Sequence, residues 1–211
     1  MSGGKILVVG ATGRVGGAAV RDPLEAGHGV RALARSAERG EGLRSLGAEV
    51  FEGDVTKPET LASALDGCAG VFSALSAGTG REAEEVEYRG NVNLLRAARE
   101  ADVRRFVYNS ALLVDHPLAQ RVGTFREKAH FEEVLLGAGG ISATVLRPVM
   151  FMETLLMARG GPVAFVPGRQ RRRVGWISAG DVARATVAAL EKDLTGRYEL
   201  AGPDTANLDE A

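Results

Sequence analysis

The fold is decided by the stretch from Lys5 to Gly17, which reads KILVVGATGRVGG. Its apolar, partly β-branched run is typical of a short buried strand. Three glycines, Gly10, Gly13 and Gly16, follow at intervals of three residues, and the pattern predicts a helix from about Arg14. A glycine triplet between a strand and a helix is the setting in which this motif binds a dinucleotide. A tight turn without a ligand is the alternative interpretation of the same residues.

Each glycine has its own physical reason in the dinucleotide interpretation. Gly10 permits the sharp turn, Gly13 lets a pyrophosphate approach the backbone, and Gly16 lets the helix lie close to the strand. The first turn of the helix adds unpaired N–H groups and a partial positive charge. From this loop we expect six cofactor-binding residues: Gly10, Thr12, Gly13, Arg14, Val15 and Gly16.

The rest of the chain alternates strand and helix patterns. Further strands are predicted at 29–35, 48–54, 69–75, 103–111, 141–149 and 196–202, and helices at 14–26, 58–67, 82–101, 124–137 and 178–193. Helix-length crossovers join parallel strands, so we expect an α/β fold with a doubly wound, Rossmann-like parallel sheet. Residues 1–211 are interpreted as a single domain with at most a small C-terminal lobe. Pro23 predicts either a kink or an early end in the first helix.

Composition narrows the possible functions. The chain has 211 residues, 45% of them hydrophobic and 25% charged, which suffices for one sizeable core. Its net charge of -1 gives no overall attraction to nucleic acid or to an anionic membrane, and we expect neither as a partner. A single cysteine, Cys68, and the lack of a signal-peptide pattern favour a reducing, cytoplasmic location. Three scattered histidines predict no metal site.

The end of the second predicted strand indicates which cofactor is bound. NAD-specific sites place an acidic residue there, whereas an arginine accommodates the 2′-phosphate of NADP. The strand reads VRALARS and puts Arg35 and Ser36 at that position, with Arg14 nearby in the glycine loop. We therefore expect NADP(H) to be preferred over NAD(H), although Arg35 is alternatively a solvated strand-end residue.

Five segments together resemble a known family. They read VVGATGRVG (8–16), VRALARS (30–36), EGDVTKPETLASALDG (52–67), VRRFVYNSA (103–111) and TVLRPVMFMETLL (144–156). In this order they resemble the atypical short-chain dehydrogenase/reductases, and within them the NmrA-like, NAD(P)H-binding group. That group includes flavin/biliverdin-reductase-like and quinone-reductase-like proteins. The resemblance covers residues 5–202, nearly the whole chain.

The resemblance implies further cofactor contacts, all after the C-terminal ends of predicted strands, where open α/β sheets bind ligands. Asp54 and Val55 would meet the adenine, and Ala74, Leu75 and Ser76 would line the ribose. Ser110 and Ala111 would flank the nicotinamide. Backbone of the segment 147–151 would approach from the other side, through Pro148, Val149 and Phe151.

The same resemblance leaves catalysis open. The family's usual motif is Tyr-x-x-x-Lys, and Lys128 matches the lysine and would contact the cofactor or the substrate. Thr124 stands where the tyrosine is expected, and a threonine is far too weak an acid to replace a phenol. A lone lysine is thought to suffice in the isoflavone-reductase-like branch, whereas regulatory NmrA-like members imply no catalysis. Ser110 is a second catalytic candidate, and Tyr108 is expected to pack within its strand.

The favoured function is an NAD(P)H-dependent oxidoreductase. It would transfer a hydride from NADPH to a flavin, a quinone or another small planar or carbonyl acceptor. The alternative is a non-catalytic NAD(P)(H)-binding redox sensor, and a sugar-nucleotide epimerase is disfavoured by the missing tyrosine. The acceptor would lie near residues 112–123 and 151–175, and the basic run 168–175 is expected to be a solvated loop. A monomer or a homodimer is expected.

Overall fold

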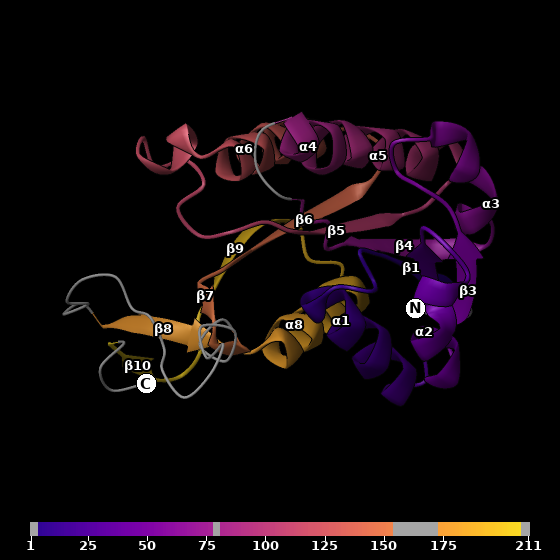
Figure 1. Cartoon of the computed structure of the whole chain (residues 1–211), viewed down its shortest axis with the longest axis horizontal. Helices are drawn as coiled ribbons and strands as arrows, with labels where there is room; N and C mark the ends of the chain where they lie inside the picture. Colours follow the sequence, from indigo (N-terminus) through magenta and orange to yellow (C-terminus); the bar gives the residue numbers. More distant parts are fainter. Residues whose placement is uncertain (1–3, 78–80, 154–172, 208–211) are drawn as a thin grey trace.

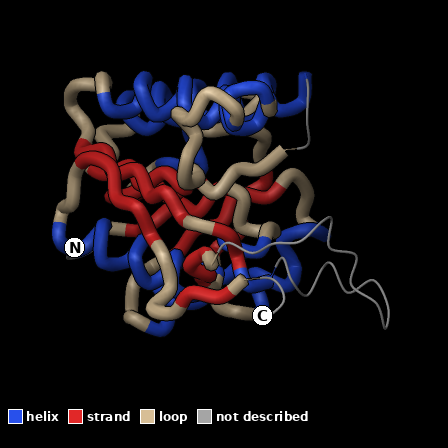
Figure 2. The backbone as a smooth tube through the Cα atoms, turned by 90° about the vertical axis from the view of Figure 1, so that its left-hand side faces the viewer, coloured by secondary structure: helices blue, strands red, loops and turns tan. Residues whose placement is uncertain are grey.

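The computed structural model describes residues 4–77, 81–153 and 173–207, and a parallel sheet lies between two layers of helices (Figures 1 and 2). The sheet has seven strands in the order β3-β2-β1-β4-β5-β6-β9, and every neighbouring pair is parallel. The order reverses direction between β1 and β4, which is the arrangement of a doubly wound fold. The predicted single-domain, Rossmann-like architecture is confirmed.

The sheet strands are β1 (Lys5–Val9), β2 (Val30–Ala34), β3 (Glu49–Glu52), β4 (Cys68–Ser73), β5 (Arg105–Asn109), β6 (Ser142–Pro148) and β9 (Gly196–Leu200). The α-helices are α1 (Arg14–Glu25), α2 (Glu41–Ser45), α3 (Ala62–Leu65), α4 (Arg81–Ala83), α5 (Asn91–Glu100), α6 (Gly123–Leu136) and α8 (Ala179–Lys192). Single turns of 3₁₀-helix lie at Glu38–Gly40, Pro58–Thr60 and Ala119–Arg121.

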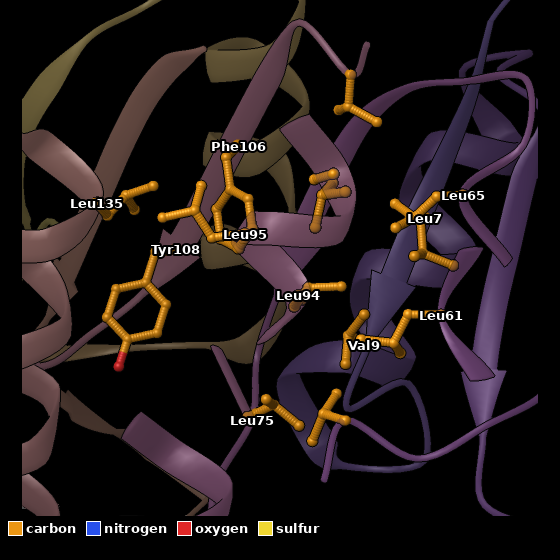
Figure 3. Close-up of a cluster of buried hydrophobic side chains, with 14 of the residues drawn as sticks. Leu7, Val9, Leu61, Leu65, Leu75, Leu94, Leu95, Phe106, Tyr108 and Leu135 are labelled. Atoms are coloured by element: carbon orange, nitrogen blue, oxygen red, sulfur yellow. The ribbon is translucent and has the colours of Figure 1, made fainter. Parts of the chain in front are cut away.

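Alternating side chains of the strands supply a core on each face of the sheet. Leu7 and Val9 of β1 point toward α3 and α5, where they join Leu61, Leu65 and Leu94 (Figure 3). Ile6 and Val8 point to the opposite face, against α1 and α8. Because these side chains are almost fully buried on both faces, the strands read as continuous apolar runs.

The helix predicted over 82–101 is more complex than expected. It consists of α4, a π-helical segment Glu84–Gly90, and α5 in direct succession. π-Helical turns are rare and often occur at functional sites. The wider turn changes which side chains face inward, and it buries the side chain of Glu87 completely.

Pro23 lies inside α1, which continues to Glu25, so the helix does not end before it. The proline removes an N–H group only in the last turn, and its own carbonyl accepts the N–H of His28. The loss of helix stability is small, because the proline removes only one intrahelical hydrogen bond and that bond lies close to the helix end.

A second, three-stranded sheet was not predicted. It is formed by β7 (Met150–Phe151), β8 (Val174–Ile177) and β10 (Thr205–Ala206), in the order β10-β8-β7. In Figure 1 it lies to the lower left, beyond the main sheet. The basic run 168–175 and the candidate acceptor region 151–175 fall largely outside the described residues, which include only 151–153 and 173–175 of them. Among the helices in the described ranges, none has the length and apolarity needed to cross a membrane.

Candidate dinucleotide and reduction site

The glycine loop between β1 and α1 leaves no room for a side chain at Gly10 or Gly16, and little at Gly13. Gly10 adopts a φ of +78°, and a Cβ there would lie 2.5 Å from the carbonyl oxygen of Ala74. A Cβ on Gly16 would overlap the Gly10 carbonyl, and one on Gly13 would lie 3.1 Å from the same oxygen. The three glycines therefore let the loop pack closely against the end of β4 and against its own backbone at the start of α1, which agrees with the dinucleotide interpretation.

The N-terminus of α1 carries no cap of its own. Gly13 is the N-cap residue, no side chain hydrogen-bonds there, and the first turn contains no acidic residue. The N–H groups of a first helical turn attract an anion, because they are unpaired within the helix and lie at its positive end. This end of α1 is suited to a phosphate group.

A cavity of about 420 Å³ lies beside this loop and collects residues from four strand ends. Nine predicted cofactor residues line it: Gly10, Thr12, Gly13, Arg35, Asp54, Val55, Ala74, Leu75 and Ser76. Four further predicted residues adjoin these in sequence without lining the cavity: Arg14, Val15, Gly16 and Ser36. The residues predicted to flank the nicotinamide lie farther along the same edge of the sheet. The cavity thus covers the part of the site predicted for the adenosine and phosphates.

Two arginines lie at the β2 side of the cavity. Arg35 follows the end of β2, and Arg39, which the sequence reasoning missed, follows on the 3₁₀ turn Glu38–Gly40. Both side chains are exposed, and Ser36 ties the turn together by accepting the N–H of Arg39 at 3.4 Å. The cavity is thus lined on this side by two guanidinium groups, whose charge and geometry are of the kind that binds phosphate.

Asp54 forms a turn next to these arginines. Its carboxylate accepts hydrogen bonds from the backbone N–H of Thr56 at 2.9 Å and from the Thr56 hydroxyl at 2.8 Å. Partial burial raises the pKa of Asp54, but these bonds and the charges of Arg35 and Lys57 outweigh it and lower the pKa overall. The carboxylate is therefore held in place as an anion at the cavity wall.

Lys128 lies on α6, and its side chain reaches the C-terminal ends of β4 and β5. Its side chain is nearly buried, and Nζ donates to the carbonyl oxygens of Leu75 at 3.4 Å and Asn109 at 3.3 Å. Leu75 lines the cavity, so the ammonium group adjoins its wall. Burial lowers the pKa of Lys128, and the charges of Glu87 and Glu132 oppose that shift.

Thr124 occupies the position of the expected tyrosine and contacts a buried carboxylate. Its hydroxyl donates to Glu87 Oε1 at 2.5 Å, and the same oxygen accepts the backbone N–H of Ala77 at 2.8 Å. Glu87 Oε2 lies 3.8 Å from Lys128 Nζ. Tyr108 is fully buried in β5, as expected of a strand residue (Figure 3). Its ring packs edge-on against that of Phe131.

Ser110 contacts a different buried glutamate. Its hydroxyl donates to Glu132 Oε1 at 2.5 Å. Glu132 also accepts two N–H groups of Arg147, the shortest at 2.6 Å, and one from Arg197 at 2.9 Å. Because Ser110 is buried and bonded to Glu132, its hydroxyl does not face open space, and its role toward a substrate stays a prediction.

The remaining nicotinamide-side residues lie at the C-terminal ends of β5 and β6. The two ends are joined by the N–H of Ser110, which donates to the Leu146 carbonyl, and by the N–H of Leu112, which donates to the Pro148 carbonyl. The other three candidates share this edge and are half-buried: Ala111, Val149 and Phe151. They form no part of the 420 Å³ cavity.

Glu87, Glu132 and Arg147 were missed by the sequence reasoning. Glutamates on an amphipathic helix are ordinarily solvated, and nothing in the local sequence indicates burial. The one available signal was the excess of glutamate at 82–87, inside a segment otherwise expected to pack on the sheet.

A scan against protein-family models matches residues 10–193 to the family described as NAD(P)H-binding. Among curated proteins, the NAD(P)H azoreductase of Xenophilus azovorans is 30% identical over 212 residues, covering 95% of this chain and 71% of that protein. The photosystem II assembly factor Ycf39 of Synechocystis is 28% identical over 210 residues, covering 94% of this chain and 62% of that protein. The chain thus spans less than two thirds of this relative's length.

Solved structures agree with the fold. An NADPH-dependent quinone oxidoreductase, QOR2 of Escherichia coli, complexed with NADPH, is 25% identical with a TM-score of 0.80, covering 96% of this chain and 71% of that one. A putative NAD-dependent epimerase/dehydratase of Bacillus halodurans is 20% identical with a TM-score of 0.78, covering 96% and 95%, and supports the fold alone. The family match over most of the chain, together with the glycine loop and its cavity, shows that the chain belongs to the NAD(P)H-binding family.

Proposed function

We propose that the chain is an NAD(P)H-dependent reductase that prefers NADPH and reduces a flavin, a quinone or another small planar or carbonyl acceptor. The observation that carries the proposal is the continuity of the site. The uncapped N-terminus of α1 lies at one wall of the cavity, and Leu75 at another wall accepts a hydrogen bond from the buried Lys128. The azoreductase and quinone oxidoreductase relatives support the same reaction class.

The residues present fit a dinucleotide. Gly10, Gly13 and the first turn of α1 would hold the pyrophosphate, because the two glycines line the cavity and the first turn has neither a capping side chain nor an acidic residue. Asp54 and Val55 would meet the adenine, and Ala74 to Ser76 would lie along the ribose and phosphates. Arg35 and Arg39, on the rim, would bind the 2′-phosphate that distinguishes NADPH from NADH.

The protein's own contribution to the reaction would be a proton at Lys128 Nζ. When bound, the reduced nicotinamide supplies a hydride, which carries two electrons to the acceptor. Lys128 would break one Nζ–H bond and give that proton to the oxygen or nitrogen of the acceptor, and solvent would then return a proton to the amine. Burial lowers the pKa of the ammonium, which makes the proton easier to release.

Exposed apolar side chains support a planar acceptor. Leu113, Leu118 and Val122 lie in the 112–123 region, and Met150 and Met152 follow β6. All five are more than 40% exposed. The two regions adjoin where the N–H of Leu112 donates to the Pro148 carbonyl, and exposed apolar side chains that lie close together are typical of a ligand or partner site. We propose that these two regions form the acceptor side, in a small lobe of a single domain.

The proposal is tested by following nicotinamide absorbance with NADPH and a panel of quinones, flavins and aldehydes. Lys128→Arg keeps the charge beside Glu87 but cannot release a proton at neutral pH. We expect turnover to fall by about 10²–10⁴-fold, with NADPH affinity within about threefold. Should Arg disturb folding, the double variant K128M/E87Q removes both charges together. Binding without turnover on any acceptor would instead indicate a redox sensor, and absence of binding contradicts both functions.

The NADPH preference has its own test. Arg35→Asp with Arg39→Ser places an acid where NAD-specific sites carry one. We expect the ratio of NADPH to NADH affinity to fall by at least about 100-fold, since two charge-assisted phosphate contacts are lost. Arg44→Ser, an exposed arginine that pairs with Glu41 in α2, is the control. An unchanged ratio of NADPH to NADH affinity in the double variant would show that these arginines do not determine the cofactor preference.

The location and assembly belong to the same proposal. The lone cysteine, Cys68, is buried and has no second cysteine in the chain, which is consistent with a reducing cytoplasm. A monomer or homodimer is proposed, to be checked by sedimentation.

A further inference from the structure

Three residues that contact or face Lys128 each carry a buried oxygen without a hydrogen-bond partner among the described residues. Four buried side-chain oxygens lack a hydrogen-bond partner in the described part of the chain: Glu87 Oε2, Tyr108 Oη, Asn109 Oδ1 and Glu153 Oε2. The first three belong to the residues that surround the Lys128 ammonium. Nζ lies 3.8 Å from Glu87 Oε2, bonds the Asn109 carbonyl, and sits 5.4 Å from the centre of the Tyr108 ring.

A buried polar atom without a hydrogen-bond partner lowers the stability of the folded protein. An unpaired buried polar group costs about 1–3 kcal/mol, and native proteins keep few of them. Of these three atoms, Glu87 Oε2 is the one that approaches the Lys128 ammonium, at 3.8 Å, so the charge of the lysine is what compensates it.

Two buried carboxylates influence Lys128, and their own partners differ. Glu132 on α6 is paired with Arg147 and Arg197 and bonded by Ser110, so its charge is already compensated. Within the described residues, Lys128 is the cation that faces Glu87, at 3.8 Å. Tyr108 of β5 contributes its ring face, and its phenol stays protonated because burial raises its pKa well above the usual value.

The threonine in the tyrosine position acquires a role in this arrangement. Its hydroxyl and the N–H of Ala77 both bind Glu87 Oε1, which leaves Oε2 directed at the ammonium. The π-helical segment makes this possible, because it carries Glu87 from the helix surface into the core.

We propose that Glu87 is a positioning residue of the reduction site: its carboxylate, held by Thr124 and Ala77, keeps Lys128 protonated and in place as the proton donor. This inference rests on the proposed function, in which Lys128 gives its proton to the acceptor. Thr124 then acts through Glu87 and not on the substrate. Removing the carboxylate leaves a buried cation with no counter-charge, so Lys128 would lose its proton at lower pH.

Glu87→Gln is the sharpest test, because the amide oxygen can still accept the bonds from Thr124 and Ala77 while the charge is lost. The pKa of Lys128 is read directly by NMR of protein labelled with carbon-13 at lysine Cε, without any acceptor. The chain has four lysines, Lys5, Lys57, Lys128 and Lys192, so Lys128→Arg identifies the signal by its disappearance. We expect the pKa to fall by about one unit or more in the Gln variant.

The kinetic readout should follow the same shift. Turnover requires protonated Lys128, so the rate falls as pH rises through its pKa, and the alkaline limb should move to lower pH in Glu87→Gln by the same amount. NADPH affinity should stay within about threefold, since Glu87 does not line the cavity. Glu127→Gln is the matched control, because Glu127 is a buried glutamate of α6 paired with Arg126 and His130.

The outcomes separate this inference from the proposed function. A Lys128 pKa that is the same in wild type and Glu87→Gln overturns the role of Glu87, even if the wild type is an active reductase. An equal shift in Glu127→Gln overturns it as well, because the effect would then be non-specific. If the wild type fails to bind NADPH, the proposed function falls, while the NMR comparison still decides whether Glu87 controls Lys128.

Discussion

Two helices that lie side by side below the sheet begin in opposite ways (Figure 1). α8 begins with a capping box: the Ser178 hydroxyl accepts the N–H of Asp181 at 3.0 Å, and the Asp181 carboxylate returns to the Ser178 N–H at 3.4 Å. Glu153 adds a bond to the N–H of Ala179 at 2.9 Å. α1 begins with glycine and has neither a capping side chain nor an acidic first turn.

The contrast indicates that the N-terminus of α8 serves stability and the N-terminus of α1 serves binding. At α8 the exposed N–H groups are satisfied by the protein's own side chains, which stabilises the helix. At α1 no side chain caps the first turn, which begins at the wall of a cavity, and the ligand would supply the negative charge. Stability and binding are thus divided between two neighbouring helix ends.

The largest expected effect comes from Gly16→Ala in α1. The added methyl group would overlap the backbone of Gly10 and lie 2.9 Å from the Cα of Ala11, so the loop must shift. We expect a loss of about 1–3 kcal/mol in unfolding free energy, measured by urea denaturation, together with loss of NADPH binding.

The next residue is the control for that change. In Gly17→Ala the added methyl group would lie 3.5 Å from the Ala11 carbonyl oxygen, an ordinary contact. This variant should be more stable than wild type by about 0.5–1 kcal/mol, because alanine is the better helix former. Equal effects of the two substitutions would show that Gly16 is not a close-contact position.

A carboxylate at the start of α1 should make it resemble α8. Gly13 has an extended backbone, φ −83° and ψ 173°, which any residue adopts, although its Cβ must gain a few tenths of an ångström from the Gly10 carbonyl. In Gly13→Asp we expect stability within about 1 kcal/mol of wild type. NADPH affinity should fall by at least about 100-fold, because like charges would meet. Gly13→Asn supplies a similar cap without the charge and should lose distinctly less affinity by calorimetry.

The smallest effect is expected where α8 caps itself. Hydrogen bonding from Ser178 lowers the pKa of Asp181, so its stabilisation is present above the unfolded-state pKa of about 3.9 and is lost as pH falls below it. Asp181→Ala should cost about 1 kcal/mol at pH 7 and progressively less below pH 4. NADPH binding should not change. A stability difference that is constant from pH 7 to pH 3 would contradict the role of the carboxylate.

Much of the fold could be predicted because its determinants are local. Apolar runs and glycine turns indicated each sheet strand and most of the long helices to within a few residues. The strands of the small sheet were missed, because β7 and β10 have two residues each and exist only through partners distant in sequence.

The candidate site could be predicted only where residue types that are visible in the sequence define it. The glycine loop and Arg35 were found, because a missing side chain and a missing acid are visible in the sequence. Glu87 was not found, since its burial depends on a π-helical turn and on packing against β5 and α6. Thr124 could be recognised as a departure from the family motif, but its partner became visible only in three dimensions.

The central claim is that a dinucleotide binds at the uncapped end of α1, and amide NMR tests it most directly. NADPH titrated into nitrogen-15-labelled protein should produce saturable shifts largest at the amides of Gly13, Arg14 and Val15, with further shifts at Arg35 and Arg39. The amides of Ala179 to Asp181, at the capped end of α8, should not move. Absence of saturable shifts, or shifts confined to other surfaces, would contradict the claim.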